Sequence, residues 1–404
     1  MRVKSLWKRF YLKKAGVDMQ KVHVGVVTTN RADYGILYPL ISKIQDSDKL
    51  ELNLIVTGAH LLDKFNTVEM VRKDGLNISK EIEMFIGTDS KSALLKSIGV
   101  GFISFADYLK EKELDLLIVL GDRAEIIVPA FSALFYGIAI AHIAGGDSID
   151  TYVTYDNSVR HAITKISHLH FVSTEEHKQR VIGMGEEENR IFNVGALGLD
   201  YIREAELMTK EQLRSILEKL DVDKPYILFT FHPIHTRTEQ LDSEMKEICR
   251  VIEDMRIQTV ITYPNSDFGH EIIINEIKQL QNAGHVELKD KLTHREYLSL
   301  MKFSSAVMGN SSSGIFEAPF FKVPTVDIGE RQRGRIKAES TINVNCDYKE
   351  IVNAINTVIF DNSFVSMCKT CRNPYGDGTS SGKIIEVLED TVYNRKLIEK
   401  KMTY

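Results

Sequence analysis

The chain has 404 residues, of which 43% are hydrophobic and 26% charged; this is a globular composition, and the length favours two domains. The net charge of −5 provides no general attraction for nucleic acid or an anionic membrane, so an anionic ligand requires a local site. The four cysteines are too few for a disulfide scaffold and favour a reducing, cytoplasmic location.

Residues 1–20 form a basic, amphipathic N-terminal extension without the continuous apolar core of a signal peptide. It is either a surface-associating appendage or an upstream extension of a chain whose natural start is Met19. We favour the second interpretation, because the first predicted strand begins at Val22. Removal of residues 1–18 is therefore expected to leave activity intact.

Residues 21–195 alternate short apolar runs with helical patterns such as Tyr38–Gln45 and Ser92–Lys110, which predicts βαβ units and a parallel sheet. The apolar run Ile126–Ala141 contains Pro129 and is too short to span a bilayer, so we expect a buried helix leading into a strand. The predicted strands are Val22–Thr28, Leu50–Thr57, Leu114–Leu120, Ile138–Ile143 and Leu169–Ser173.

Residues 196–380 repeat this rhythm and predict a second Rossmann-like domain, with a hinge in the stretch from Gly195 to Lys224 that contains a charged helix at Lys210–Leu220. Residues 381–404 are expected to form a C-terminal helix that packs back toward the hinge. The fold expected is therefore α/β, with two Rossmann-like parallel-sheet domains facing across a cleft, where ligand sites often lie. The predicted strands of this half are Tyr226–Phe231, Thr259–Thr262, Ala306–Met308 and Thr325–Ile328.

Three acidic segments occur between Gly121 and His161. Glu125 and Asp147 each follow a predicted buried strand, and Asp156 begins the third segment. Because open α/β sheets bind ligands beyond the carboxyl ends of their strands, these carboxylates are candidates for proton transfer. The alternative is that Asp122 and Asp156 are helix N-caps.

A candidate anion site follows the strand Ala306–Met308, at Gly309-Asn-Ser-Ser-Ser-Gly314. Small residues allow close approach of a ligand, and the hydroxyls of Ser311 and Ser312 add donors for a phosphate. Glu317 is placed to accept from a ribose diol. The segment is not a Walker loop, and the alternative is a capped helix start without a ligand.

Basic residues in three other segments complete the candidate site. Arg31 lies in the first strand–helix turn, Arg331 and Arg335 follow the strand Thr325–Ile328, and His232 ends the strand Tyr226–Phe231. Arginine side chains suit phosphate oxygens. We expect no metal, because neither the histidines at 161, 168 and 170 nor the pair Cys368 and Cys371 has the spacing of a closed zinc site.

Six segments, in order between about Lys21 and Gly382, resemble the hydrolysing UDP-N-acetylglucosamine 2-epimerases that open sialic acid biosynthesis. The resemblance implies a GT-B-like fold, a UDP-sugar substrate, no metal or redox cofactor, and a homodimer or homotetramer. The segments are Thr29-Asn-Arg-Ala-Asp-Tyr-Gly35, Gly121-Asp-Arg-Ala-Glu125, His142-Ile-Ala-Gly-Gly-Asp147, Arg160-His-Ala-Ile-Thr-Lys165, Gly309-Asn-Ser-Ser-Ser-Gly314 and Gly329–Gly334.

The resemblance also implies the reaction. The C2 proton and UDP are lost to give a 2-acetamidoglucal, and water is then added with inversion at C2, which requires a base, a proton donor and neutralisation of the departing diphosphate. The positions that match the family's catalytic ones are Glu125, Asp147, Asp156 and His232. Those that match nucleotide or sugar contacts are Arg31, Ala32, Arg123, Asn265, Ser311, Ser312, Glu317 and Arg331.

The sequence departs from the family pattern at the carboxylates. Many relatives have Gly-Gly-Glu where this chain has Gly145-Gly-Asp147, and Ala124 replaces a bulky apolar residue. We expect Asp147 or Asp156 to act at C2 and Glu125 to manage water. These departures leave open a sugar with a further 4-acetamido group, as in legionaminic acid pathways, and a different nucleotide.

Three alternatives remain at this level. A non-hydrolysing epimerase would carry a Thr-Gly-Gln-His turn, which Thr57-Gly-Ala-His60 only half matches. A glycosyltransferase of the same architecture would need an acceptor groove and no base at C2. An inactive nucleotide-sugar-binding protein would be consistent with the change at Asp147.

Overall fold

The computed structural model describes residues 21–62, 67–86, 90–148, 155–234, 238–265, 269–401 and 403, so the N-terminal extension predicted at 1–20 lies outside the described residues. The chain divides into two compact units. Unit 1 comprises Met1–Asp147, Thr154–Tyr201 and Gly378–Tyr404, and unit 2 comprises Ser148–Val153 and Ile202–Asp377. The boundaries predicted at residues 195 and 380 stay a prediction.

Unit 1 is built on a seven-stranded parallel sheet in the order β3-β2-β1-β4-β5-β6-β7. Its strands are β1 (Val22–Thr28), β2 (Leu50–Thr57), β3 (Ile78–Ile82), β4 (Leu116–Leu120), β5 (Ala139–Ile143), β6 (Leu169–Val172) and β7 (Ile191–Asn193). Its helices are α2 (Arg31–Asp46), α3 (Val68–Lys73), α4 (Lys91–Glu111), α5 (Ile127–Phe135), α6 (Tyr155–Ile166), α7 (Glu175–Gly183), α16 (Ser380–Asp390) and α17 (Arg395–Ile398), while α8 (Gly198–Glu204) crosses the boundary between the units.

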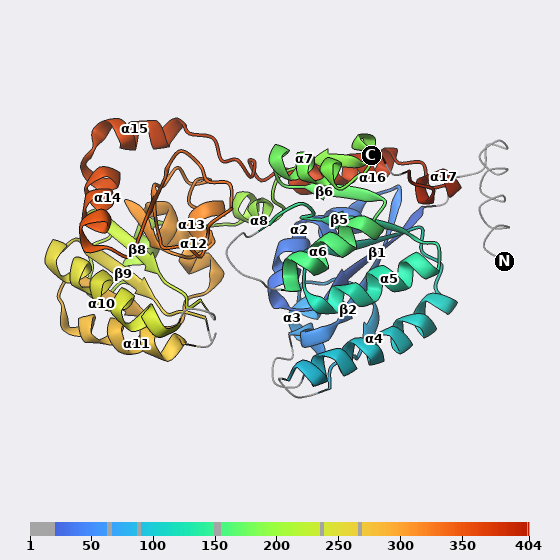
Figure 1. Cartoon of the computed structure of the whole chain (residues 1–404), viewed down its shortest axis with the longest axis horizontal. Helices are drawn as coiled ribbons and strands as arrows, with labels where there is room; N and C mark the ends of the chain where they lie inside the picture. Colours follow the sequence, from blue (N-terminus) through green and yellow to red (C-terminus); the bar gives the residue numbers. More distant parts are fainter. Residues whose placement is uncertain are drawn as a thin grey trace. The chain divides into compact units, whose positions relative to one another are not determined.

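The central strands of unit 1, such as β4 and β5, are buried on both faces, as expected for a parallel sheet covered by helices on both sides. Val26 of β1 packs in a cluster with α2, α3 and α16, whereas its neighbour Val27 packs in a second cluster with α4, α5 and α6. Figure 1 shows α4 and α5 running side by side. The C-terminal helix α16 packs against α2 of unit 1.

Unit 2 contains a six-stranded parallel sheet in the order β10-β9-β8-β11-β12-β13. Its strands are β8 (Tyr226–Thr230), β9 (Gln258–Thr262), β10 (Val286–Lys289), β11 (Ala306–Gly309), β12 (Thr325–Ile328) and β13 (Thr341–Val344). Its helices are α9 (Lys210–Arg214), α10 (Thr238–Met255), α11 (His270–Gln279), α12 (His294–Phe303), α13 (Ser313–Phe316), α14 (Tyr348–Phe360) and α15 (Asn362–Thr370). Phe229 of β8 packs against α10, α11 and α14, and Leu228 packs against α9 and α12 on the other face.

The predicted α/β class with two Rossmann-like parallel sheets is confirmed, and every strand predicted from an apolar run is present. The prediction missed β3, β7, β10 and β13, which lie toward the sheet edges and are short or partly polar. The predicted helix Lys210–Leu220 is too long, because α9 ends at Arg214 and the chain then continues through turns that still bury Leu217. That the two domains face across a cleft stays a prediction.

In the part of the chain that the structure describes, α4 is long and apolar enough to cross a membrane by length and composition, and the bent pair of α14 and α15 passes the same test together.

Candidate functional site

The strand order of unit 1 reverses direction between β1 and β4, and the crevice beyond the carboxyl ends of such strands is the usual ligand position in open α/β sheets. The turns after β1, β4 and β5 carry the predicted site residues of this unit. Arg31 and Ala32 are exposed in the first turn of α2, and Arg123 and Glu125 follow β4. Asp147 lies four residues beyond the end of β5.

The turn after β1 is fixed by Asp33, a residue that the sequence reasoning overlooked. Asn30 caps α2 in a capping box with Asp33. The buried Asp33 carboxylate also accepts hydrogen bonds from the Thr29 backbone at 2.9 Å and from the Thr29 hydroxyl at 2.5 Å. The Asp33 carboxylate is therefore hydrogen-bonded within the turn, while the adjacent Arg31 and Ala32 are exposed at the surface.

The turn after β4 pairs two of the predicted residues. Gly121 has a φ of 78°, a left-handed conformation that favours glycine. The Arg123 Nε then donates to Glu125 Oε1 at 2.6 Å. Glu125 is buried while Arg123 is exposed, so the guanidinium neutralises a carboxylate that is otherwise shielded from water.

The third turn is organised by Arg160, a buried residue of α6 that the sequence reasoning noted only as part of a motif. Its Nη1 donates to the Ala144 carbonyl at 3.0 Å and to Asp147 Oδ2 at 3.4 Å, and its Nη2 pairs with Asp122. His177 Nε2 lies 3.6 Å from the other oxygen of Asp147. Asp122 is therefore an ion-pair partner of Arg160, and the alternative that it caps a helix is wrong.

Asp156 lies in the first turn of α6, half-buried and four residues before Arg160. Residues four apart lie on the same face of a helix, so Asp156 and Arg160 share one. Arg160 thus pairs directly with Asp122 and Asp147, and Glu125 forms its own pair with Arg123.

Three buried histidines of unit 1 have structural partners. The His142 Nε2 bonds to the Gly121 carbonyl at 2.8 Å, and burial lowers the pKa of His142 to about 3, so this ring is neutral. His168 Nδ1 accepts from the Ile140 backbone at 3.0 Å, and His170 lies 3.2 Å from Glu186. In the described ranges no three His, Cys, Asp or Glu side chains gather as a metal site would require.

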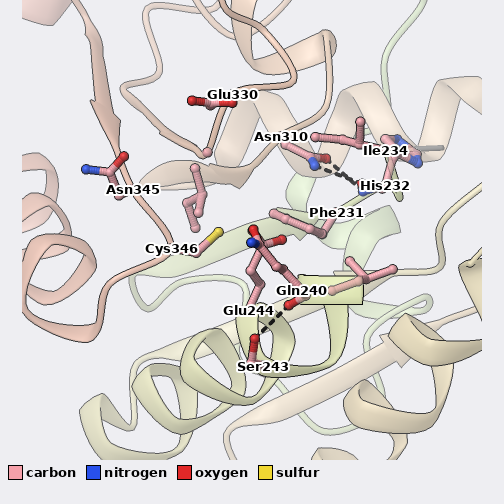
Figure 2. Close-up of a pocket in the computed structure, with 13 residues that line it drawn as sticks. Phe231, His232, Ile234, Gln240, Ser243, Glu244, Asn310, Glu330, Asn345 and Cys346 are labelled. Carbon is pink, nitrogen blue, oxygen red and sulfur yellow. Dashed lines mark hydrogen bonds between the residues drawn. The ribbon is translucent and has the colours of Figure 1, made fainter. Parts of the chain in front are cut away.

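Unit 2 has its own reversal of strand order, between β8 and β11, and Asn310 connects the two strand ends. Its Oδ1 accepts from the His232 backbone N–H at 2.7 Å, and its Nδ2 donates to the His232 carbonyl at 2.8 Å (Figure 2). The Asn265 backbone N–H donates to His232 Nδ1 at 3.2 Å. Asn310 thus positions the His232 backbone, a role that the sequence analysis missed, and the Asn265 N–H orients the His232 ring.

The backbone carbonyl of Asn310 is also held by the segment that follows β12, because it accepts from Arg331 Nη1 at 3.0 Å and from Gln332 Nε2 at 2.8 Å. Arg335 in turn donates to Gln332 Oε1 at 2.7 Å. The predicted residues Arg331 and His232 are thus brought to the same asparagine. Its signal in the sequence was its position directly after the strand-ending Gly309.

The serine turn after β11 lies beside Tyr297. The Ser313 hydroxyl donates to Ser311 Oγ at 2.9 Å and lies 2.6 Å from the Tyr297 hydroxyl. Ser311 and Ser312 remain half-buried, and the adjoining helix α13 is only four residues long. Burial raises the pKa of Glu317 to about 7, and the proximity of this carboxyl contributes to raising the pKa of Tyr297, for which burial is the larger cause.

A cavity of about 450 Å³ opens at the carboxyl edge of this sheet (Figure 2). Of the predicted residues of unit 2, His232 lines it; Asn265, Ser311, Ser312, Glu317 and Arg331 do not. The lining residues are Phe231, His232, Ile234, Gln240, Leu241, Ser243, Glu244, Asn310, Ile328, Gly329, Glu330, Asn345 and Cys346.

Comparisons with known proteins address the family directly. A family model described as UDP-N-acetylglucosamine 2-epimerase matches residues 42–389. The chain is 37% identical over 330 residues to a GDP/UDP-N,N'-diacetylbacillosamine 2-epimerase (hydrolyzing) of Campylobacter jejuni, covering 80% of this chain and 85% of that protein. It is 33% identical to the polysialic acid biosynthesis protein P7 of Escherichia coli, covering 91% and 94%.

Among solved structures, the fold is similar to that of the UDP-GlcNAc 2-epimerase from Neisseria meningitidis bound to UDP-GlcNAc. The TM-score is 0.77 at 18% identity, over 92% of this chain and 100% of that one. At this identity the likeness bears on the fold alone.

Proposed function

This chain belongs to the UDP-N-acetylglucosamine 2-epimerase family, and we propose that it is a hydrolysing 2-epimerase of nonulosonic acid biosynthesis. It converts UDP-N-acetylglucosamine, or its 4-acetamido variant, and water into UDP and the free sugar epimerised at C2. The observation that carries the proposal is the set of carboxylates at one sheet edge. There Asp147 forms an ion pair with Arg160, and Glu125 forms one with Arg123. The Campylobacter jejuni relative, named for a diacetamido sugar, supports the 4-acetamido variant as a substrate.

In the first step a carboxylate removes the C2 proton while the bond from C1 to the UDP oxygen breaks, which leaves a double bond between C1 and C2. We assign this base to Asp147 or Asp156. A weakly acidic C–H requires a base at a fixed distance, and Arg160 and His177 hold Asp147 in one orientation. The departing diphosphate carries away the electron pair.

In the second step water adds across the double bond. A hydroxide equivalent is delivered to C1. A proton is delivered to C2 on the face opposite to that from which the first proton was removed. Glu125 is the group assigned to water, because it is buried and its charge is balanced by Arg123. Neither step requires a metal or a redox cofactor.

The nucleotide contacts are assigned to unit 2. Ser311, Ser312 and Arg331 supply donors for the diphosphate, and the raised pKa of Glu317 places its titration near neutral pH, where its ionised form accepts from the ribose diol. His232 contacts the diphosphate or sugar. Arg31, Ala32 and Arg123 of unit 1 and Asn265 of unit 2 complete the contact set. We assign the enzyme to the cytoplasm as a homo-oligomer.

The test is incubation in deuterated water with UDP-N-acetylglucosamine and, separately, with its 4-acetamido variant, followed by NMR. Release of UDP and of a free 2-epimeric sugar with deuterium at C2 supports the proposal, and the faster substrate identifies the sugar. A UDP-sugar returned with deuterium at C2 would select the non-hydrolysing epimerase. Transfer only to an added acceptor, or binding without turnover, would select a glycosyltransferase or an inactive binding protein.

A further inference from the structure

Tyr297 of α12 reaches the serine turn (residues 309–314) with its hydroxyl group. The Tyr297 oxygen lies 2.6 Å from Ser313 Oγ and 3.5 Å from Thr230 Oγ1. The Ser313 hydroxyl in turn donates to Ser311 Oγ at 2.9 Å. Tyr297, Ser313 and Ser311 therefore form one hydrogen-bonded line. Because each hydroxyl has a single hydrogen, the donor at each contact can be assigned.

The direction of this line follows from the hydrogen of Ser313. That hydrogen goes to Ser311, so Ser313 Oγ accepts at its contact with Tyr297, and the Tyr297 O–H is the donor there. The tyrosine keeps its proton, because desolvation and, second, the nearby Glu317 raise the pKa of the Tyr297 hydroxyl above its ordinary value. Tyr297 thus donates to Ser313, and Ser313 donates to Ser311.

The contact with Thr230 does not reverse this direction. The Thr262 hydroxyl donates to the Phe229 carbonyl at 3.4 Å, so the hydrogen at the 2.6 Å contact between Thr230 and Thr262 comes from Thr230. Thr230 then has no hydrogen left for Tyr297. At 3.5 Å the Thr230 oxygen also competes poorly with Ser313 for the tyrosine hydrogen.

Ser311 is the last acceptor of the line. Its Oγ accepts from the Ser313 hydroxyl and also from the Ser313 backbone N–H at 3.4 Å. Within the described part of the chain these are the two hydrogen bonds of Ser311 Oγ, and it accepts both. A hydroxyl with two occupied lone pairs still has its hydrogen to donate. The half-buried Ser311 is therefore held as a donor.

The backbone of the serine turn is fixed independently of Tyr297. Gly309 has a φ of 127°, and a Cβ there would clash with the Thr230 carbonyl oxygen. A Cβ at Gly314 would lie 2.8 Å from Thr325 Cγ2, and Thr325 Oγ1 donates to the Gly314 carbonyl at 2.9 Å. Close contacts with β8 and β12 therefore hold both ends of the turn. Removal of the Tyr297 hydroxyl is expected to free the serine hydroxyls and to leave the path of the backbone unchanged.

We propose that Tyr297 is a positioning residue, which through Ser313 fixes the Ser311 hydroxyl as a donor toward an anionic oxygen of a nucleoside diphosphate. The inference rests on the proposed function, which assigns Ser311 to that group. A phosphate oxygen accepts hydrogen bonds and donates none, so a serine whose hydrogen is already free binds it without first reorienting. Such preorganisation increases affinity because less freedom is lost on binding.

The first test measures the binding of UDP to the full chain by calorimetry, and the binding of uridine by its competition with UDP. Tyr297→Phe removes one hydroxyl and is expected to weaken UDP binding about fivefold. Uridine binding should stay unchanged, because uridine carries no phosphate. Tyr226→Phe is the matched control, since the hydroxyl of this buried tyrosine donates to the Leu300 carbonyl of α12 at 2.5 Å. It should leave both affinities unchanged, and thermal unfolding verifies that each variant is folded.

A double-mutant cycle tests whether Tyr297 acts through Ser311. Ser311→Ala alone should weaken UDP binding about tenfold, since it removes a hydrogen bond to a charged group. Adding Tyr297→Phe to Ser311→Ala should weaken binding by less than about a further twofold, because the donor that Tyr297 orients has gone. A tyrosine that merely supports the packing of α12 would weaken UDP binding equally in both backgrounds.

Five outcomes would overturn the inference: a wild type that does not bind UDP at about 1 mM, a UDP affinity indifferent to Tyr297→Phe, an equal loss for uridine, an equal loss in Tyr226→Phe, or an undiminished effect of Tyr297→Phe in the Ser311→Ala background. All are binding measurements, so they decide the role of Tyr297 separately from turnover. A wild type that binds UDP but releases no epimerised sugar would count against the proposed function alone.

Discussion

Asn310 holds the backbone of His232 from both sides, because its amide accepts from the His232 N–H at 2.7 Å and donates to the His232 carbonyl at 2.8 Å. The two residues follow neighbouring strands, His232 two residues after β8 and Asn310 directly after β11, at the point where the strand order of unit 2 reverses. A side-chain amide here does what a backbone ladder does inside the sheet. The two bonds keep the chain after β8 aligned with the chain after β11, and so they position His232 at the carboxyl edge of the sheet.

Asn310→Ala removes both bonds and leaves the His232 peptide groups without these partners. We expect a loss of about 2–3 kcal/mol in the free energy of unfolding and a fall in kcat, measured by urea denaturation and steady-state kinetics. The control is Asn345→Ala, an exposed asparagine lining the same cavity. Equal effects of the two substitutions would contradict the role given to Asn310.

Arg160→Lys keeps the charge but cannot reach Asp122, Asp147 and the Ala144 carbonyl together. A carboxylate displaced by about 1 Å is expected to lower kcat roughly 100-fold, with KM little changed. The measurement is steady-state kinetics alongside thermal unfolding, with the exposed Arg203→Lys as control. A kcat close to that of the wild type would show that Arg160 does not position Asp147.

Asp147→Asn keeps the size of the side chain and removes its basicity. Turnover should be abolished, while UDP affinity measured by calorimetry stays within a few-fold, because the nucleotide contacts are assigned elsewhere. The variant also leaves His177 and Arg160 a polar neighbour, so the fold is preserved. Undiminished activity would remove Asp147 from the mechanism.

Glu186 predicts a pH dependence of stability in unit 1. Its side chain is 1% exposed and receives bonds from Lys165 and Lys400 at 2.8 Å. Burial raises the pKa of the Glu186 carboxyl, but the bonds from His170, Lys165 and Lys400 lower it by more, to about 2. The folded pKa lies below the ordinary value of 4.5, so this contribution is present above pH 4.5 and is lost as the pH falls toward 2.

Glu186→Gln should therefore lower the free energy of unfolding by about 2 kcal/mol at pH 7, because it leaves two partly buried lysines without their carboxylate partner. The difference from the wild type should shrink progressively below pH 4.5, measured by denaturant titrations at several pH values. Glu176→Gln, which removes an exposed i,i+4 pair, is the control and should change little. A difference that is constant from pH 7 to pH 3 would rule out the depressed pKa.

The sequence by itself determined the fold class and the position of the acids. Apolar runs such as Leu116–Leu120 are buried on both faces, so their composition alone indicates parallel strands, and the residues directly after such strands lie at the carboxyl edge of the sheet. The six ordered sequence motifs also indicated the protein family, which the family model confirms. Strands such as β13 (Thr341–Val344) escaped because a short, partly polar edge strand has no apolar signature of its own.

Only the tertiary structure decided what the polar residues bind. Asp122 had the position of a helix cap, yet it pairs with Arg160, which is 38 residues away in the chain. Asn310 meets His232 across a separation of 78 residues. A hydrogen bond requires that donor and acceptor be placed to within a few tenths of an ångström of the ordinary distance. Tertiary packing sets that placement for residues far apart in the chain, and local sequence patterns do not specify it. The acids and Arg123 were visible in the sequence, whereas the partners that orient Asp147 and His232, namely Arg160 and Asn310, were not.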